Sequence, residues 1–134
     1  MIDYYPEIFT AVSKPLREAV PKVHVTGTVS TSDTDKFPCV TIEEIRNEDT
    51  NIDNGPTATE ARLQYRVTVL SNKVGGRVAE ARRILAEADK ILQSLNFRRL
   101  SMTTQDGMYN NSAYKIEATY VARINQNGAI SLSQ

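Results

Sequence analysis

His24 and Cys39 are of types that often carry chemistry, and each is the single residue of its kind in this sequence. A cysteine nucleophile needs a histidine within hydrogen-bond reach to activate it. Cys39 lies in an apolar segment without a glycine-rich approach, which is typical of a buried thiol that acts as a small apolar side chain. Neither residue belongs to a set of three or four ligands with the spacing of a zinc site. We therefore expect neither catalysis nor metal binding at these positions.

Two further features, a pair of glutamates and a pair of glycines, each resemble one part of a known type of active site. The other residues of such a site are missing. Glu43 and Glu44 are adjacent in a predicted strand, so they point to opposite faces and cannot form an acid–base pair with each other. Gly75 and Gly76 precede a predicted helix, but no Gly-Lys-Ser/Thr or G-x-G-x-x-G pattern accompanies them. The sequence thus predicts no enzyme, no nucleotide site and no cofactor.

The composition is that of an ordinary domain. The chain has 134 residues, of which 40% are hydrophobic, enough for one core. Sixteen basic and sixteen acidic residues balance, which argues against binding nucleic acid by bulk electrostatics. A lone cysteine allows no internal disulfide and suits a reducing compartment. No secretory signal or membrane span is predicted. We expect a protein made in the cytoplasm.

Two segments have apolar residues at helical spacing. The first covers residues 4–20, and Pro15 inside it removes a backbone donor and clashes with the preceding turn, which predicts a kink near Ser13 or two short helices. The second covers residues 77–95 and has the more regular apolar stripe. Asn96 follows it and is typical of the left-handed residue that ends a helix.

Five segments have the composition or the apolar alternation of β-strands. They are residues 22–29, 37–46, 61–70, 97–104 and 113–125. The stretch 47–60 lacks apolar periodicity, so we expect a loop that is mobile in the free subunit and ordered only in an assembly. From Gln126 the tail is expected to be frayed.

The elements follow one another in the order α-β-β-β-α-β-β, which indicates the α+β class. The alternation in residues 61–70 and 113–125 is that of an antiparallel sheet with one buried and one polar face. A mainly antiparallel sheet with two helices packed on one face would bury every apolar stripe. The sequence has no repeat and no linker, so we expect a single domain over residues 1–134.

The charges are balanced overall but unevenly placed. Residues 43–60 are mainly acidic, and residues 77–99 are mainly basic. Two ordinary solvated faces would explain this layout. The alternative is a head-to-tail contact between the acidic segment of one subunit and the basic segment of the next, a geometry that can close into a ring. On that hypothesis the candidate subunit-contact residues are Glu43, Glu44, Glu48, Asp49, Asp53, Arg77, Arg82 and Arg83.

Several segments together resemble the small tail terminator (tail completion) proteins of long-tailed bacteriophages, which are also described as minor tail proteins. The segments are FPCVTIEEIRNEDT, VTVLSN, GGRVAEARRILAEADKILQSLNF, RRLSMTTQDGMYN and AYKIEATYVARI. The resemblance covers roughly residues 1–125 and depends on the order of these segments rather than on one diagnostic motif.

The resemblance implies a structural virion protein without catalytic residues, metal or cofactor. Its copies would form a homo-oligomeric ring, a hexamer on the tail, that caps the tail tube and ends polymerisation of the tube protein. The ring would also present a surface to the head connector and so take part in head–tail joining. DNA would pass through its lumen without being held. The protein would act in the tail or neck of the virion after assembly in the host cytoplasm.

Two alternatives stay open at this point. Within the same class, a head-completion or connector ring of the phage neck would be built from similar small α+β subunits. From a different class, a small cytoplasmic enzyme or ligand-binding domain would need a deep pocket that contains carboxylates with perturbed pKa values. A ring-shaped oligomer favours the first class, and such a pocket favours the second.

Overall fold

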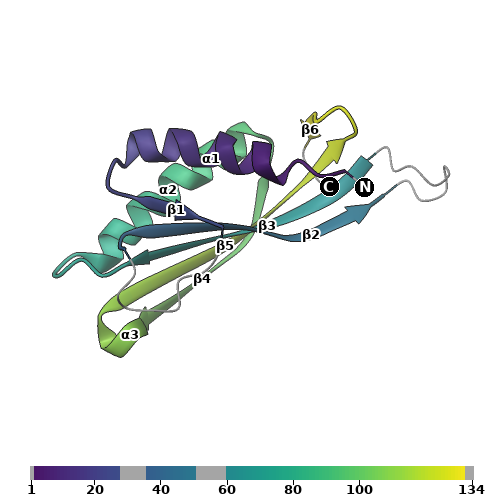
Figure 1. Cartoon of the computed structure of the whole chain (residues 1–134). Helices are drawn as coiled ribbons and strands as arrows, with labels where there is room; N and C mark the ends of the chain where they lie inside the picture. Colours follow the sequence, from purple (N-terminus) through teal and green to yellow (C-terminus); the bar gives the residue numbers. More distant parts are fainter. Residues whose placement is uncertain (1, 28–35, 51–59, 132–134) are drawn as a thin grey trace.

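Two long helices lie on one face of a six-stranded sheet (Figure 1). The computed structural model describes residues 2–27, 36–50 and 60–131. In chain order the elements are α1 (Tyr5–Ala19), β1 (His24–Thr26), β2 (Cys39–Asp49), β3 (Glu60–Ser71), α2 (Arg77–Ser94), β4 (Arg98–Gly107), α3 (Met108–Asn111), β5 (Ala113–Asn125) and β6 (Ile130–Ser131). The predicted α+β class and the order α-β-β-β-α-β-β are confirmed, with the short α3 and β6 in addition.

The strands lie side by side in the order β1-β2-β3-β5-β4, and β6 pairs with β5. All pairs are antiparallel except β1 with β2. The central pair, β3 with β5, keeps one register from Glu60 opposite Asn125 to Ser71 opposite Tyr114. The outer pairs are less regular, because the register shifts in β2 between Glu44 and Arg46 and in β4 between Arg99 and Ser101.

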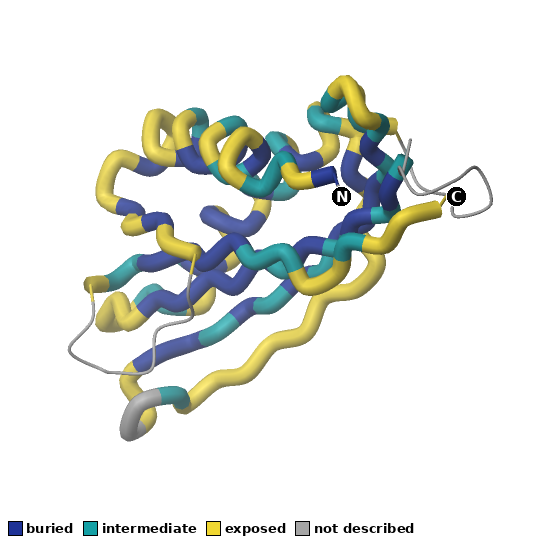
Figure 2. The backbone as a smooth tube through the Cα atoms, turned by 45° about the vertical axis from the view of Figure 1, so that its right-hand side comes forward, coloured by how far each residue is buried: buried dark blue, intermediate teal, exposed yellow. Residues whose placement is uncertain are grey.

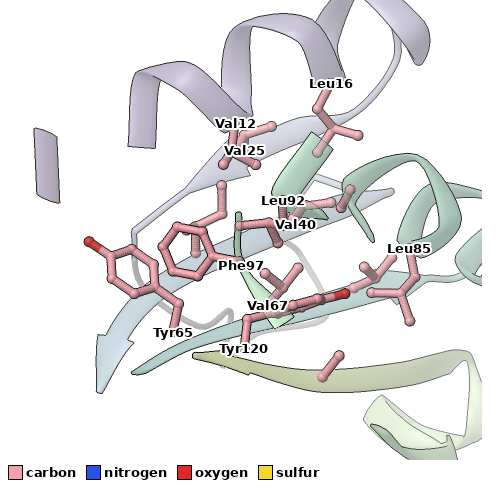
Figure 3. Close-up of a cluster of buried hydrophobic side chains, with 14 of the residues drawn as sticks. Val12, Leu16, Val25, Val40, Tyr65, Val67, Leu85, Leu92, Phe97 and Tyr120 are labelled. Atoms are coloured by element: carbon pink, nitrogen blue, oxygen red, sulfur yellow. The ribbon is translucent and has the colours of Figure 1, made fainter. Parts of the chain in front are cut away.

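The core lies between the sheet and the two helices. The odd-numbered residues of β3 from Ala61 to Val69 are buried on this side, as the alternation predicts. Tyr65 meets Phe97 edge to face, with 5.4 Å between the ring centroids (Figure 3). Such an aromatic pair contributes about 0.5–1.5 kcal/mol beyond the burial of its area. Phe97 follows α2 directly, so this contact ties the end of α2 to the centre of the sheet.

The first helix is one element, and the prediction of two short helical pieces is wrong. α1 continues through Pro15 without interruption to Ala19. Ser13 is buried inside the helix and does not cap a second one. Ile8, Val12 and Leu16 pack into the core one turn apart, and this packing outweighs the loss of one backbone hydrogen bond at the proline.

The strands that flank the predicted loop are longer than the sequence indicates. β2 runs to Asp49 and β3 begins at Glu60, and the Thr50 amide donates to the Glu60 carbonyl at 3.0 Å. The prediction of a loop over the whole of 47–60 is therefore wrong at both ends, because cross-strand pairing orders polar residues as well as apolar ones. Residues 51–59 lie outside the described part of the chain. The predicted strand 22–29 is shorter, His24–Thr26, and residues 28–29 are also not described.

The C-terminal segment is held against the body of the protein up to Ser131, so the prediction that it frays from Gln126 is wrong for residues 126–131. Asn125 accepts hydrogen bonds from the amides of Asn127 and Ala129, which forms a turn that returns the chain as β6. The Tyr4 hydroxyl donates to the Gln126 carbonyl at 3.0 Å. The region beyond Ser131 is not described.

Asp89 on α2 fixes the helix to the sheet through part-buried polar contacts. Its carboxylate accepts a hydrogen bond from the Tyr120 hydroxyl of β5 at 2.7 Å. The guanidinium of Arg99 on β4 lies 3.7 Å from the same carboxylate. Burial first, and then this carboxylate, raise the pKa of Tyr120, so the hydroxyl stays protonated and remains a donor. Asn96 ends the helix at φ 67°, the predicted left-handed position.

Replacement of Asp89 by alanine is expected to destabilise the protein by about 1–3 kcal/mol, because the buried Tyr120 hydroxyl loses its acceptor. The free energy of unfolding from urea denaturation measures this. Addition of Tyr120→Phe to Asp89→Ala should recover part of the loss, since no buried donor then lacks a partner. A double variant whose loss equals the sum of the two single losses would contradict this role of Asp89.

Candidate functional site

The helix-free face of the sheet is a grid of polar side chains. Residues that pair across strands share a face, so the register places Glu43 of β2, Arg66 of β3, Thr119 of β5 and Ser101 of β4 in one row. Other rows of this face contain Arg62, Arg123, Lys115 and Glu117 in the same way. No described helix covers these positions (Figure 1). Thr41 and Thr68 on this face are nevertheless only 1% exposed, so the part that is available to another molecule lies around Glu43 and Arg66.

Ion pairs lie between neighbouring strands and along β5 on this face. Arg66 lies 3.3 Å from the Glu43 carboxylate and 4.0 Å from that of Glu117. Lys115 lies 3.8 Å from Glu117. All four side chains are partly exposed, so each pair contributes only about 0–1 kcal/mol. These pairs set the local charge pattern more than they stabilise the fold.

Two arginines on the same face have polar atoms without partners. Arg62 and Arg123 are direct cross-strand neighbours in β3 and β5. The Nε atom of each is buried and lacks a hydrogen-bond partner among the described residues. One terminal nitrogen of Arg123 does reach the Glu60 carboxylate at 3.6 Å. Glu48 on β2 is the cross-strand neighbour of Arg62, so the two cations at this corner of the sheet lie beside two carboxylates.

The described acidic candidates all lie on β2, but they face different sides of the sheet and have different partners. Glu43 points to the helix-free face, whereas Glu44 accepts a hydrogen bond from the Tyr65 hydroxyl at 3.0 Å on the core side. The prediction that these neighbours point to opposite faces is confirmed. Glu48 lies 3.3 Å from Arg46, and Asp49 is exposed. Asp53 is outside the described residues.

The basic candidates lie in the first two turns of α2. Arg77 lies 3.0 Å from the Asp106 carboxylate and also donates to the Asn111 carbonyl at 2.7 Å, so it braces the β4–β5 connection. Arg82 and Arg83 are exposed. The structure thus gives Arg77 an intramolecular structural role and leaves the other two on the surface.

The two charged groups do not meet within one subunit. The C-terminal end of β2 and the start of α2 lie at opposite ends of the sheet, at the right and left of Figure 1. β3, with 12 residues, connects these ends and spans about 40 Å at 3.4 Å per residue. Opposite charges at opposite ends can only approach each other between two copies.

A further surface was not singled out from the sequence. All ten residues of β4 are exposed (Figure 2), and a depression of about 370 Å³ separates this strand from α2. Arg82, Lys90, Arg99 and Met102 are among its lining residues. The signal in the sequence was the polar run after Leu100, which is typical of an edge strand.

The structure places His24 and Cys39 side by side, although 15 positions separate them in the sequence. They are direct partners in the parallel register of β1 and β2. His24 is exposed, and Cys39 is 5% exposed, as predicted for a buried thiol. A buried sulfur cannot reach a substrate, so proximity alone does not make this pair a nucleophilic site.

The surface offers little that suits an enzyme. The depression at the start of α2, of about 720 Å³, is lined by residues that include Lys73, Gly76 and Arg77 and contains no carboxylate. Among the described residues, no three His, Cys, Asp or Glu side chains are grouped to hold a metal ion. None of the described helices is long and apolar enough to cross a membrane.

Glu44 is the described carboxylate with a raised pKa, and it belongs to the core rather than to a depression. Burial raises the pKa of Glu44, with a smaller contribution from the Asp3 carboxylate, while the hydrogen bond from Tyr65 opposes the shift. The Tyr65 hydroxyl also has a raised pKa, from burial first and then from Glu44. Burial beside the paired strands β2 and β3 accounts for both raised pKa values, so they give no indication of a substrate site.

No protein-family model matches this sequence, and no curated protein is similar to it. Among solved structures, the fold is similar to that of a chain in the virion of a native gene transfer agent (GTA) particle. The TM-score is 0.52 and the identity 13%, and the match covers 92% of this chain and 99% of the other. At this identity the similarity is one of fold.

The double variant His24→Ala with Cys39→Ala is expected to assemble normally, with a stability loss of about 1 kcal/mol or somewhat more from the buried sulfur. Electron microscopy of the variant and its thermal unfolding midpoint test this. A well-folded, normally stable double variant that no longer assembles would show that the pair has a function.

Replacement of Glu44 by glutamine is expected to raise stability at neutral pH. The pKa of the Glu44 carboxyl group is higher in the folded than in the unfolded protein. Its favourable contribution to stability is therefore complete below the unfolded-state pKa and is lost as the pH rises through the folded-state pKa, where the group ionises. Glutamine keeps an acceptor for Tyr65 but does not ionise. The unfolding midpoint of Glu44→Gln relative to the parent should therefore increase from about pH 4, near the usual glutamate value, towards neutrality. The exposed Glu48→Gln is the matched control, and an equal pH trend in both variants would contradict the assignment.

Proposed function

We propose that this protein is a structural component of a phage or phage-like virion that acts as a tail terminator. In this role its copies form a ring, a hexamer on the tail, that caps the tail tube and ends polymerisation of the tube protein. The ring then contacts the head connector, and DNA passes through its lumen. The protein works through surfaces and has no catalytic activity.

The observation that carries the proposal is the fold shared with a GTA virion chain over nearly the whole of both chains. Because the match includes 99% of that chain, a subunit of this size and architecture is sufficient for a place in a particle. The segments that resemble tail terminators in sequence include the strands and α2 that make up this shared fold. Together they favour a tail or neck protein over an unrelated α+β domain.

The charge layout supports assembly by contacts between unlike surfaces. Acidic residues lie on β2 and basic residues on α2, at opposite ends of the sheet, so each copy has two complementary surfaces that cannot satisfy each other internally. A contact of this kind between copies is heterologous, and it forms a closed ring when the rotation permits. A net charge near zero leaves no long-range repulsion between copies to oppose this.

Charge reversal tests the proposal directly. Glu48→Lys with Asp49→Lys, and Arg82→Glu with Arg83→Glu, are each expected to reduce ring formation while the monomer stays folded. Mixing the two variants should restore rings in which they alternate, since every contact then joins an acidic surface to a basic one, and all four changes in one chain should also restore part of the assembly. Electron microscopy and mass photometry at low salt measure the rings, and circular dichroism measures the fold.

Two outcomes would contradict the proposal. A parent protein that stays monomeric at all concentrations and does not bind the ends of purified tail tubes is not a terminator. Rings that bind to heads and not to tail tubes would assign the protein to the neck instead. If both charge variants form rings as well as the parent, the charges are ordinary surface charges.

A further inference from the structure

One edge of the sheet, β4, is long, and no strand of the described part of the chain lies on its outer side. All ten of its residues are exposed, and among the described residues it pairs only with β5. Six consecutive residues, Leu100–Gln105, have no charge, no proline and no glycine. Leu100 and Met102 are 48% and 39% exposed. An edge of this kind is a ready template for another strand, and proteins normally shield it with charges or a bulge. β4 has both at its start, where two arginines precede the bulge at Leu100, so residues 102–105 are its unshielded part.

The opposite edge of the sheet is also open along part of its length. β1 pairs with β2 only over Cys39–Thr41, and the Tyr5 hydroxyl donates to the Ile42 carbonyl at 2.6 Å. Beyond Ile42, the side of β2 that faces away from β3 has no strand beside it in the described part of the chain. Ile45, at the bulge of this segment, is 38% exposed. Among the described residues, the free edge is therefore Glu43–Asp49.

The two edges match in direction. β2, β3, β5 and β4 alternate in direction across the sheet, so β4 runs antiparallel to β2. A second copy placed beside β4 in the same orientation would present its β2 edge antiparallel to it. The alternation of strand direction would then continue from one copy to the next, and the helices of both copies would lie on the same side of the joined sheet.

The two edges also match in charge. The free segment of β2 has four acidic residues against Arg46. The depression beside β4 is lined by Arg82, Lys90 and Arg99, with Asp89 as the one acid. The register aligns Glu43 and Glu44 with the start of β4 at Arg99 and Ser101, whereas Glu48 and Asp49 extend beyond that start, so the two edges share a height only at the beginning of the acidic segment.

We infer that β4 of one copy pairs with the free Glu43–Asp49 edge of β2 in the next copy, which joins neighbouring subunits through one continuous antiparallel sheet. Main-chain hydrogen bonds supply the contact, Leu100 and Ile45 supply its apolar part, and the charges set its direction. The inference rests on the proposed ring and identifies the surface by which the ring is made. Because the two edges differ, the contact is heterologous and can repeat around an axis.

A matched pair of variants tests this edge contact. Leu100→Asp places an acid at the bulge of β4, next to the acidic edge of the neighbour, and should raise the concentration needed for half assembly by about tenfold or more. Val74→Asp makes the same change at a residue that is 98% exposed in the β3–α2 connection, away from both edges, and should leave assembly unchanged. Circular dichroism checks that both variants fold.

Hydrogen exchange of the full-length parent protein, as monomer and as ring, supplies an independent measurement. Peptides that cover Arg98–Gly107 and Glu43–Asp49 should both exchange at least about tenfold more slowly in the ring, because their outward amides become hydrogen-bonded. Rings in which these peptides exchange as in the monomer, or rings that form equally well with Leu100→Asp, would overturn the edge contact and leave the ring itself standing. A parent protein that forms no ring at all would overturn both proposals.

Discussion

The pairing of β3 with β5 is the interaction on which the rest of the structure depends. It runs without a break from Glu60 opposite Asn125 to Ser71 opposite Tyr114. It joins residues that are far apart in the sequence and places Tyr65 and Tyr120 as direct neighbours under the helices. β2 and β4 are then added on either side, and α2 packs on the strands of this central pair. A shift of one residue in this register would move every apolar side chain of one strand to the solvent face.

The sequence predicts the parts of the fold that depend on local patterns. Alternation in residues 61–70 identified β3 and its buried side chains, and the apolar stripe of 77–95 identified α2 together with its left-handed end at Asn96. The sequence did not predict those parts of the fold that are determined by contacts between residues far apart in the chain. Packing of α1 on the core holds Pro15 inside one helix, and cross-strand pairing extends β2 through the polar residues 47–49. Polarity alone does not distinguish a loop from an exposed strand.

The candidate site could also be predicted only in part, because some of its properties depend on contacts between residues far apart in the chain. Charge counting found the acidic and basic groups, because charge is visible in composition. It could not show that Glu44 accepts a hydrogen bond from Tyr65 or that Arg77 holds Asp106, since these partners become neighbours only in the folded chain. It did place Arg98 and Arg99 in the basic group, but it could not show that they begin the exposed edge strand β4. The structure thus separates charges that serve the fold from those that remain for another molecule.

The two register shifts have a consequence for shape. One lies beside Glu44 in β2 and the other beside Arg99 in β4, and the register places these residues at the same level, on either side of Tyr65 and Tyr120. An extra residue bends its strand and increases its twist. The two edge strands thus depart from regular geometry at one height, while the central pair of β3 and β5 keeps its register there. The local twist of these two edges, repeated from copy to copy, would contribute to the curvature of any assembly built by joining them.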